Sequence, residues 1–229
     1  MKMKTLKRFS VRRLEAGGVG RTDRQYTLMR LDEQTVSPDP FKQFSLWYEE
    51  AVKSGVDLPN AFALSTVSDG GKPSCRMLLL KEADGRGFVF YTNSMSRKGL
   101  EMAENSRVSA CFFWSAFERQ VRIEGAVGEV SEKEADDYFA SRPRASQLGA
   151  WASPQGRVVS DRGELEESFR SCEDRFSGLP QIPRPPHWKG YRITPSVFEF
   201  WQGRENRMHD RIRHRLDKNG RWIIERLAP

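Results

Sequence analysis

The chain has 229 residues, of which 38% are hydrophobic and 11% aromatic, a composition typical of a globular protein and not of a disordered one. Its 38 Lys and Arg residues outnumber its 31 Asp and Glu residues, and the resulting net charge of +7 predicts anionic partners. The longest stretch without Asp, Glu, Lys or Arg, 145–156, is far shorter than the ~20 apolar residues of a membrane-spanning helix, so we expect a soluble protein that binds no membrane.

Basic residues are concentrated at the start of the chain. Six of them precede the first acidic residue: Lys2, Lys4, Lys7, Arg8, Arg12 and Arg13. No apolar core follows them, which argues against a secretory signal. We interpret residues 1–38 as a basic tail that is partly disordered, with an organelle-import segment as the alternative, and residues 39–229 as a single domain.

The three cysteines, Cys75, Cys111 and Cys172, are odd in number and widely spaced. They match no zinc-site or redox-pair spacing, and the histidines form no metal-ligand pattern either. We therefore expect no metal, and reduced thiols in a reducing compartment such as the cytoplasm.

A helix over 40–53 is the first predicted element, since Asp39 can cap it and Pro40 suits its first position. Beyond it the sequence changes to segments rich in β-branched and aromatic residues. Five strands are predicted, at 61–67, 74–81, 87–93, 107–114 and 119–130. Turn residues at 68–73 and 83–86 predict hairpins, and a short helix over 96–105 interrupts the strands.

The next part of the chain is predicted to be helical. Two capping boxes start helices near Ser131 and Asp161, Pro143 ends the first of them, and a short helix lies between. After a proline-rich connector the chain closes with three predicted strands, at 197–203, 209–216 and 221–227. The whole pattern predicts a mainly β fold with flanking helices (α+β), in which an antiparallel barrel carries helices on its outside.

The segment Ser96-Arg97-Lys98 is unusual because it opens a helix directly after a strand. Ser96 is a natural N-cap, so Arg97 and Lys98 fall in the first turn, where cations oppose the helix dipole. A bound anion would remove this conflict, because free backbone N–H groups and both side chains can hold it. The segment therefore predicts a phosphate site, although surface cations also occur at such positions by chance.

Two further groups of polar residues suggest anion binding. Arg76 stands in a strand that is otherwise apolar, where a guanidinium needs an anionic or carbonyl partner, whereas Lys81 has the ordinary explanation of an edge position. Tyr138 and Arg142 share a helix face with Ser146 just beyond, so the three could hold a phosphate. Arg142 near a helix C-terminus also has an ordinary dipole explanation.

The segment WQGRENRMHDR brings several cations together near the end of the chain. If Arg207 begins a strand, then Arg207, His209 and Arg211 point to the same side, next to Trp201 as an aromatic wall for a planar ligand. The alternative is a solvated edge strand. Taken together, the patterns predict a phosphorylated cofactor and a phosphorylated substrate, but they do not identify flavin.

At these positions the sequence resembles the pyridoxine/pyridoxamine 5′-phosphate oxidases. Seven segments carry the resemblance in the family's order: RMLLLK, FYTN followed by SRK, ERQVRIEG, YFASRPRASQLGAW, EFWQG, NRMHDR and ERLAP. The resemblance extends over residues 39–229. It implies an FMN-binding split β-barrel and a homodimer with FMN at the subunit interface.

The resemblance also implies roles for individual residues. The implied contacts to FMN are Arg76, Met77, Leu78, Leu79, Leu80, Lys81, Tyr91, Thr92, Arg97, Lys98, Gln120, Gln155, Trp201 and Arg211. The implied holders of the substrate phosphate are Lys81, Tyr138, Arg142 and Ser146. Arg207 and His209 would face the substrate's pyridine ring as the catalytic residues.

Two departures from the family's pattern affect this transfer of roles. Gly156 stands where the family usually has Ser, so one hydroxyl contact to the cofactor would be missing. Near the N-terminus the family has a basic segment that ends in Tyr and covers the substrate. The nearest match here is 23–26, with Asp23 where a base is common, and Arg24 and Tyr26 are carried over as substrate contacts.

The implied reaction is the last step of vitamin B6 cofactor synthesis and salvage, the oxidation of pyridoxine or pyridoxamine 5′-phosphate to pyridoxal 5′-phosphate. A hydride would pass from substrate C4′ to flavin N5, and O2 would then reoxidise the flavin and yield H2O2. Arg207 and His209 would position the ring and assist proton removal. Near flavin N1, Arg211 and Gln120 would stabilise negative charge.

Three alternatives remain. A split-barrel flavin reductase acting on another substrate has no need of a phosphate clamp at Tyr138, Arg142 and Ser146. A protein that stores or delivers pyridoxal phosphate or flavin would produce no peroxide. Nucleic-acid binding from charge alone predicts an exposed basic stripe, whereas many of the basic residues here fall in or beside strands, so we expect no nucleic-acid partner.

Overall fold

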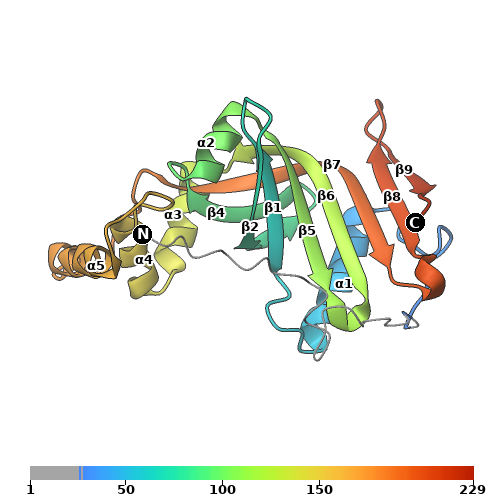
Figure 1. Ribbon diagram of the computed structural model, residues 1–229, viewed down its shortest axis with the longest axis horizontal. Coiled ribbons are helices and arrows are strands. Elements are labelled where there is room, and N and C mark those ends of the chain that lie inside the picture. The colour runs from blue at the N-terminus through green and yellow to red at the C-terminus, as the bar shows by residue number, and fades with distance from the viewer. Residues whose placement is uncertain (1–25, 27) are drawn as a thin grey trace, which may run out of the picture.

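The computed structural model describes residue 26 and residues 28–229 (Figure 1). Within this part of the chain, nine strands form one antiparallel sheet in the order β2-β1-β5-β6-β7-β4-β3, with β8 added to β7 and β9 to β8. The strands are β1 Ala61–Val67, β2 Pro73–Leu79, β3 Glu82–Asp84, β4 Gly87–Asn93, β5 Arg107–Trp114, β6 Arg119–Glu129, β7 Trp188–Gln202, β8 Asp210–Leu216 and β9 Trp222–Arg226. The helices are α1 Pro40–Lys53, α2 Arg97–Glu104, α3 Glu132–Ser141, α4 Arg144–Ala152 and α5 Arg162–Phe176, with short 3₁₀ turns η2 Ser115–Phe117 and η3 Glu205–Arg207.

Helix α1 covers the buried face of the sheet, and Figure 1 shows it behind the strands. Its start follows the sequence prediction, because the Asp39 carboxylate accepts a hydrogen bond from the Phe41 N–H at 2.9 Å. Phe44 and Trp47 then pack edge-on against aromatic rings of β4, β5 and β7. The predicted mainly β fold with flanking helices is confirmed.

The two faces of the sheet differ in burial. Successive residues of a strand point to opposite faces, and the alternating burial of β1 and β5 follows that period. Leu64, Ala110 and Ile123 stand opposite one another on β1, β5 and β6, and all three are buried on the side of α1. On the other face, Met77 and Phe113 are among the exposed large hydrophobic residues.

The prediction for β7 was too short. The strand begins at Trp188, not near 197, and its first half pairs with β4 while its second half pairs with β8. Pro195 hides the strand in the sequence because proline removes a ladder hydrogen bond. It is tolerated here because the register with β6 shifts between Glu124 and Gly125, which places Pro195 at a bulge.

The predicted strand at 209–216 starts one residue later, at Asp210, and the argument that depended on it was wrong. Arg207 lies in η3, and both Asn206 and Arg207 have positive φ, 55° and 59°. That conformation is incompatible with an extended strand. Strand alternation therefore does not place Arg207, His209 and Arg211 on one face.

The predicted strand at 74–81 ends early, at Leu79. The backbone N–H of Leu80 donates to Asn60, whereas that of Lys81 donates to Val89 of β4. The chain thus passes from the β1 side of the fold to the β4 side at these two residues. As a result, the predicted turn at 83–86 joins β3 to β4 and not β2 to β4.

Helices α3, α4 and α5 gather at one end of the sheet (Figure 1). The N-caps of both predicted helices are confirmed, because Ser131 and Asp161 accept hydrogen bonds from the backbone N–H groups of Glu134 and Glu164. A second core packs Phe139, Leu148, Phe176 and Ile182 against Trp188. No helix in the described part of the chain is both long and apolar enough to cross a membrane.

Candidate active site

The first turn of α2 is the centre of a basic cluster. Ser96 occupies the N-cap position, but its hydroxyl donates to the Asn93 carbonyl at 2.6 Å instead of capping the helix. Arg97 and Lys98 follow in the first turn, as predicted, and the guanidinium of Arg76 lies close enough to perturb Lys98 electrostatically.

Lys98 is a buried cation without a charged partner. Its side chain donates to Ser96 at 3.0 Å and to Gln155 at 2.8 Å, and no ion pair to Lys98 exists among the described residues. Burial, and secondly the charge of Arg76, lower the pKa of Lys98 to about 8. A buried ammonium needs an anion to offset its desolvation. This part of the site therefore fits the phosphate of a cofactor, with Thr92 completing it through a 3.3 Å hydrogen bond to Gln155.

Glu101 is a member of this cluster that sequence reasoning missed. One carboxylate oxygen accepts from Arg97 at 2.8 Å, and the other accepts from the hydroxyls of Thr66 and Ser74 and lies 3.5 Å from Arg76. Burial acts to raise the pKa of Glu101, but the hydrogen bonds from these hydroxyls and from Arg97 outweigh it and bring the pKa to about 2. The spacing of four residues after Arg97 was the available signal.

Arg76 has hydrogen-bond partners of the kind predicted for a guanidinium in an apolar strand. Its guanidinium donates to the Leu64 carbonyl at 3.1 Å and to the Thr66 hydroxyl at 2.7 Å, besides its bond to Ser74. The residues after Arg76 alternate: Met77 and Leu79 are exposed, Leu78 packs on the core, Leu80 is buried and Lys81 is exposed. Apart from Arg76, this segment therefore offers a ligand mainly backbone and apolar surface.

A second cluster of predicted site residues lies where β4, α3 and the start of β7 meet. The rings of Tyr91, Tyr138 and Trp188 are stacked, with 4.1 Å between the two tyrosine centroids. Burial, ahead of charge interactions, raises the pKa of Tyr91 to about 12, so its hydroxyl stays protonated. The Lys81 ammonium lies 6.0 Å from the Tyr138 ring centroid.

Arg142 is the decisive residue of this second cluster. Its guanidinium carbon lies 4.9 Å from the centroid of Trp188, and its Nη1 is buried without any hydrogen-bond partner among the described residues. Burial lowers the pKa of Arg142. Ser146 follows at the start of α4, half-buried. The donor set fits a phosphate group, which would satisfy the orphaned nitrogen.

On the opposite face of the sheet, four residues form one cross-strand row. Phe113, Gln120, Trp201 and Arg211 stand directly opposite one another on β5, β6, β7 and β8. Residues paired in this way point to the same face. Glu199, which sequence reasoning did not find, holds the Arg211 guanidinium with two hydrogen bonds of 2.8 and 3.1 Å and so fixes its orientation.

An aromatic cluster adjoins this row. The His209 ring lies 4.7 Å from Trp201 and 5.5 Å from Tyr26, measured between centroids. Tyr26 of the predicted substrate-covering segment thus lies beside two other predicted site residues, whereas Arg24 lies outside the described residues. Arg207 is exposed in η3, beside this cluster.

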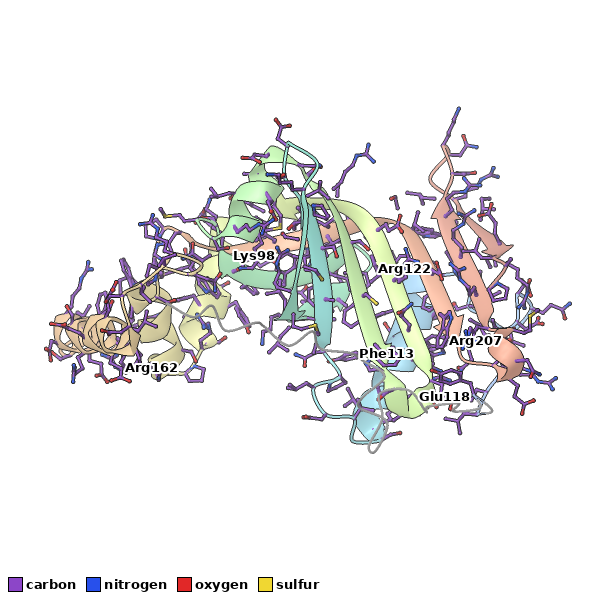
Figure 2. The ribbon with its side chains drawn as sticks, in the orientation of Figure 1. Lys98, Phe113, Glu118, Arg122, Arg162 and Arg207 are labelled. Atoms are coloured by element: carbon purple, nitrogen blue, oxygen red, sulfur yellow. The ribbon has the colours of Figure 1, made fainter. Side chains whose placement is uncertain are left out.

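The predicted site residues fall into two separate sets. One set surrounds Lys98 and Arg76, and the other is the row that contains Gln120, Trp201 and Arg211. Arg76 stands opposite Leu64, and hence on the α1 face, whereas Gln120 points to the other face because it lies three residues from Ile123 on β6. Figure 2 shows Lys98 and Arg207 at opposite ends of the sheet. Within one chain, the sheet therefore lies between the two sets.

Gly156 follows Gln155 in the loop after α4. Its φ of +87° lies in the left-handed region, which favours glycine over serine. The departure from the family's pattern therefore suits the backbone of this loop.

The antiparallel sheet with helices on its outside is a split β-barrel, a fold that FMN-binding proteins share. Residues 48–201 match the family model described as pyridoxamine 5′-phosphate oxidase, and residues 188–229 match that of the pyridoxine 5′-phosphate oxidase C-terminal dimerisation region. The chain belongs to the pyridoxamine 5′-phosphate oxidase family, and its cofactor is FMN.

Relatives with curated names support this membership over nearly the whole chain. A pyridoxine/pyridoxamine 5′-phosphate oxidase from Rubrobacter xylanophilus is 52% identical, and one from Gloeothece citriformis is 50% identical, each over 90% of this chain and over 94% and 96% of their own lengths. Among solved structures, PhzG from Burkholderia lata, in complex with tetrahydrophenazine-1-carboxylic acid, has a TM-score of 0.83 and 29% identity over 90% of this chain and all of that chain. An FMN-binding protein from Nostoc punctiforme shares the fold, with a TM-score of 0.67 and 17% identity over 84% of this chain and all of its own.

Proposed function

We propose that the protein oxidises pyridoxine 5′-phosphate and pyridoxamine 5′-phosphate to pyridoxal 5′-phosphate in the cytoplasm, with O2 as the electron acceptor. The alcohol and O2 would give the aldehyde and H2O2, and the amine would in addition consume one water and release ammonia. This reaction would be the last step of vitamin B6 cofactor synthesis and salvage. The curated relatives bear the name of this activity.

The observation that carries the proposal is the orphaned Nη1 of Arg142. A buried guanidinium nitrogen without a partner is costly unless a ligand supplies the acceptor. The Trp188 ring against which Arg142 lies is also stacked with Tyr138, at 6.1 Å between centroids, and the Lys81 ammonium is 6.0 Å from the Tyr138 ring. These residues support a phosphorylated substrate in addition to the phosphorylated cofactor near Lys98.

The separation of the two sets supports a homodimer with FMN between the two subunits. The cluster around Lys98 would hold the cofactor phosphate from one copy, and Gln120, Trp201 and Arg211 would contact the flavin from the other. Met77 and Phe113, 64% and 59% exposed on the outer face, supply apolar surface that a second copy would cover. The match of residues 188–229 to a dimerisation region supports the same arrangement.

When bound, FMN would supply the two-electron redox chemistry, with hydride acceptance at N5 and reoxidation by O2. The residues of the chain bind and orient. Arg142, Tyr138, Ser146 and Lys81 would hold the substrate phosphate, and Arg207 and His209 would hold the pyridine ring. Arg211, oriented by Glu199, and Gln120 would place donors near the negative charge that develops at flavin N1.

The decisive experiment separates the two half-reactions. The purified protein is loaded with FMN and mixed with pyridoxine 5′-phosphate without oxygen, and air is then readmitted. We expect the flavin band to bleach, to recover with air, and pyridoxal 5′-phosphate and peroxide to accumulate. If flavin binds but bleaches with neither the alcohol nor the amine, the oxidase proposal fails. A flavin reductase on another substrate, or a storage protein, then becomes the better description.

Arg207 provides a second test. Arg207→Ala should leave FMN content unchanged but lower kcat/KM by about 100-fold, because an oriented cation is lost from the ring site. Arg207→Lys, which keeps the charge, should lose less. An unchanged rate in Arg207→Ala would remove this residue from the mechanism.

A further inference from the structure

One hydrogen bond determines which nitrogen of His209 carries its proton. The backbone N–H of Arg204 donates to Nδ1 of His209 at 3.1 Å. A backbone N–H can only donate, so Nδ1 must present its lone pair, and the neutral imidazole carries its hydrogen on Nε2. None of the described residues forms a hydrogen bond with Nε2, which leaves this N–H free for a ligand.

Arg204 is held in turn by Asp210, through its guanidinium group. One Asp210 oxygen accepts from the Arg204 guanidinium at 3.2 Å and from the Leu31 N–H at 3.1 Å, and the other accepts from Arg226 at 2.8 Å. The Asp210 side chain is only 15% exposed. A single carboxylate therefore joins the N-terminal segment, the loop after β7, the start of β8 and strand β9.

The loop between Arg204 and His209 needs a contact of this kind to fix its conformation. Between Arg204 and His209 the chain turns through η3, where Asn206 and Arg207 both have positive φ. Side-chain-bearing residues hold this conformation only when their surroundings enforce it. The ion pair from Arg204 to Asp210 closes the loop at its base, on either side of the two residues with positive φ.

We propose that Asp210, acting through Arg204, is a positioning residue that fixes His209 as a hydrogen-bond donor through Nε2. The proposal rests on the proposed function of the site, in which His209 faces the substrate. It changes the role expected for this histidine: a neutral His209 whose Nε2 already carries hydrogen cannot take the substrate's proton at that atom. Its contribution is to orient an electron-rich atom of the substrate ring.

The tautomer is directly measurable. The chain has three histidines, so ¹⁵N-histidine labelling gives three sets of ring signals, and His209→Gln assigns the set of His209. Long-range ¹H–¹⁵N correlation of the FMN-loaded protein above the His209 pKa should show a protonated Nε2 and a bare Nδ1. A protonated Nδ1 in the wild-type protein would overturn the proposal.

The positioning role is tested by variants of Arg204. Arg204→Met should convert the His209 signals to a mixture of tautomers and lower kcat about tenfold with FMN affinity unchanged, because the orientation of the imidazole is lost. Arg204→Lys should restore both. Arg204→Met and Asp210→Asn should be non-additive, since both break the same link. Arg221→Met, which removes an exposed ion pair to Asp217 at the β8–β9 turn, is the matched control and should change neither readout.

Substitutions of His209 itself distinguish a role as hydrogen-bond donor from a role as proton-accepting base. Glutamine places an amide N–H near the position of Nε2 and should retain activity within about tenfold, whereas asparagine, which reaches only the position of Nδ1, should lose about 100-fold, like alanine. Equal losses in glutamine and asparagine would contradict the donor role. If the protein oxidises neither phosphorylated substrate, the proposed function fails, while the NMR experiment still decides the tautomer.

Discussion

Lys98 carries an ammonium group into a position that is only 9% exposed, where its hydrogen-bond partners are the uncharged Ser96 and Gln155. The nearby carboxylate of Glu101 is engaged by Arg97 and Arg76 instead. Three cations and one carboxylate leave this cluster with a charge close to +2, which matches the dianionic phosphate of FMN. The residues are thus arranged for a doubly charged anion and not for a neutral ligand.

The depressed pKa of Lys98 predicts how FMN binding depends on pH. Without ligand the pKa is about 8, and a bound phosphate favours the charged form, so binding raises that pKa and takes up a proton above pH 8. At pH 9 a group of pKa about 8 is only about one tenth protonated, so FMN should bind about tenfold more weakly than at pH 7. Titration of the flavin fluorescence at both pH values measures this ratio. In Lys98→Met the ratio should fall to nearly one, and a ratio that persists in this variant would assign the titration to another group.

At the scale of residues, the sequence supplied the charges but not their partners. Arg97 and Lys98 were recognisable because cations in a first helical turn conflict with the dipole. Glu199 and the link from Asp210 to Arg204 were not, because their roles depend on pairing across strands or on a loop with positive φ. Such contacts leave no periodic pattern in the sequence.

Helix α2 is the element that we expect to hold the cofactor phosphate. The double variant Arg97→Met/Lys98→Met should bind FMN at least about 100-fold more weakly, since two charge-assisted contacts are lost. The control is Lys133→Met/Arg162→Met, which removes the same charge from the first turns of α3 and α5, where both side chains are more than four-fifths exposed. Figure 2 shows Arg162 at the far end of the molecule from the barrel. Equal losses of FMN affinity in the two double variants would show that the net charge of the protein, and not the position of the two cations on α2, causes the weaker binding.

The N-terminal segment packs against the rest of the fold at Gly203. A Cβ added to Gly203, just after β7, would meet the ring of Tyr26 at 2.6 Å, so the tyrosine sits against bare backbone. Gly203→Ala should displace Tyr26 from Trp201 and His209 and raise KM severalfold with a smaller effect on kcat. The double variant with Tyr26→Ala should be no worse than either single variant, because both remove the same contact. Additive losses would show that Gly203 acts on something other than Tyr26.

Among the elements, those with a strong local pattern were predicted well and those shaped by their neighbours were not. The helix over 40–53 and the helix N-caps depend on local hydrogen bonds. The first half of β7 was missed because Pro195 and Gly190 break the strand pattern, although a bulge and close packing on Tyr91 accommodate them. The start of β8 was placed too early because the positive φ of Arg207 is not encoded by a glycine.

At the scale of the molecule, the fold class followed from the spacing of strands and turns, but the distribution of the site over two faces did not. Register decides which face a residue occupies, and register is a long-range property. The division into a tail of 1–38 and a domain of 39–229 stays a prediction. In the described part of that tail, Leu31 and Ser37 bond to Asp210 and His214 of β8.

The separation of the two sets leads to a prediction about mixed dimers. If each site takes its phosphate cluster from one copy and Arg207 from the other, two inactive variants should complement each other. In a heterodimer of Arg97→Met/Lys98→Met with Arg207→Ala, one of the two sites combines an intact cluster with an intact Arg207, and the other carries all three substitutions. Co-expression with two different tags and tandem purification yields this heterodimer, which should have about half of the wild-type activity. If each site were built from a single chain, neither copy in the heterodimer would have a complete site. A heterodimer as inactive as both parents would therefore place Arg207 and the α2 cluster in the same subunit's site.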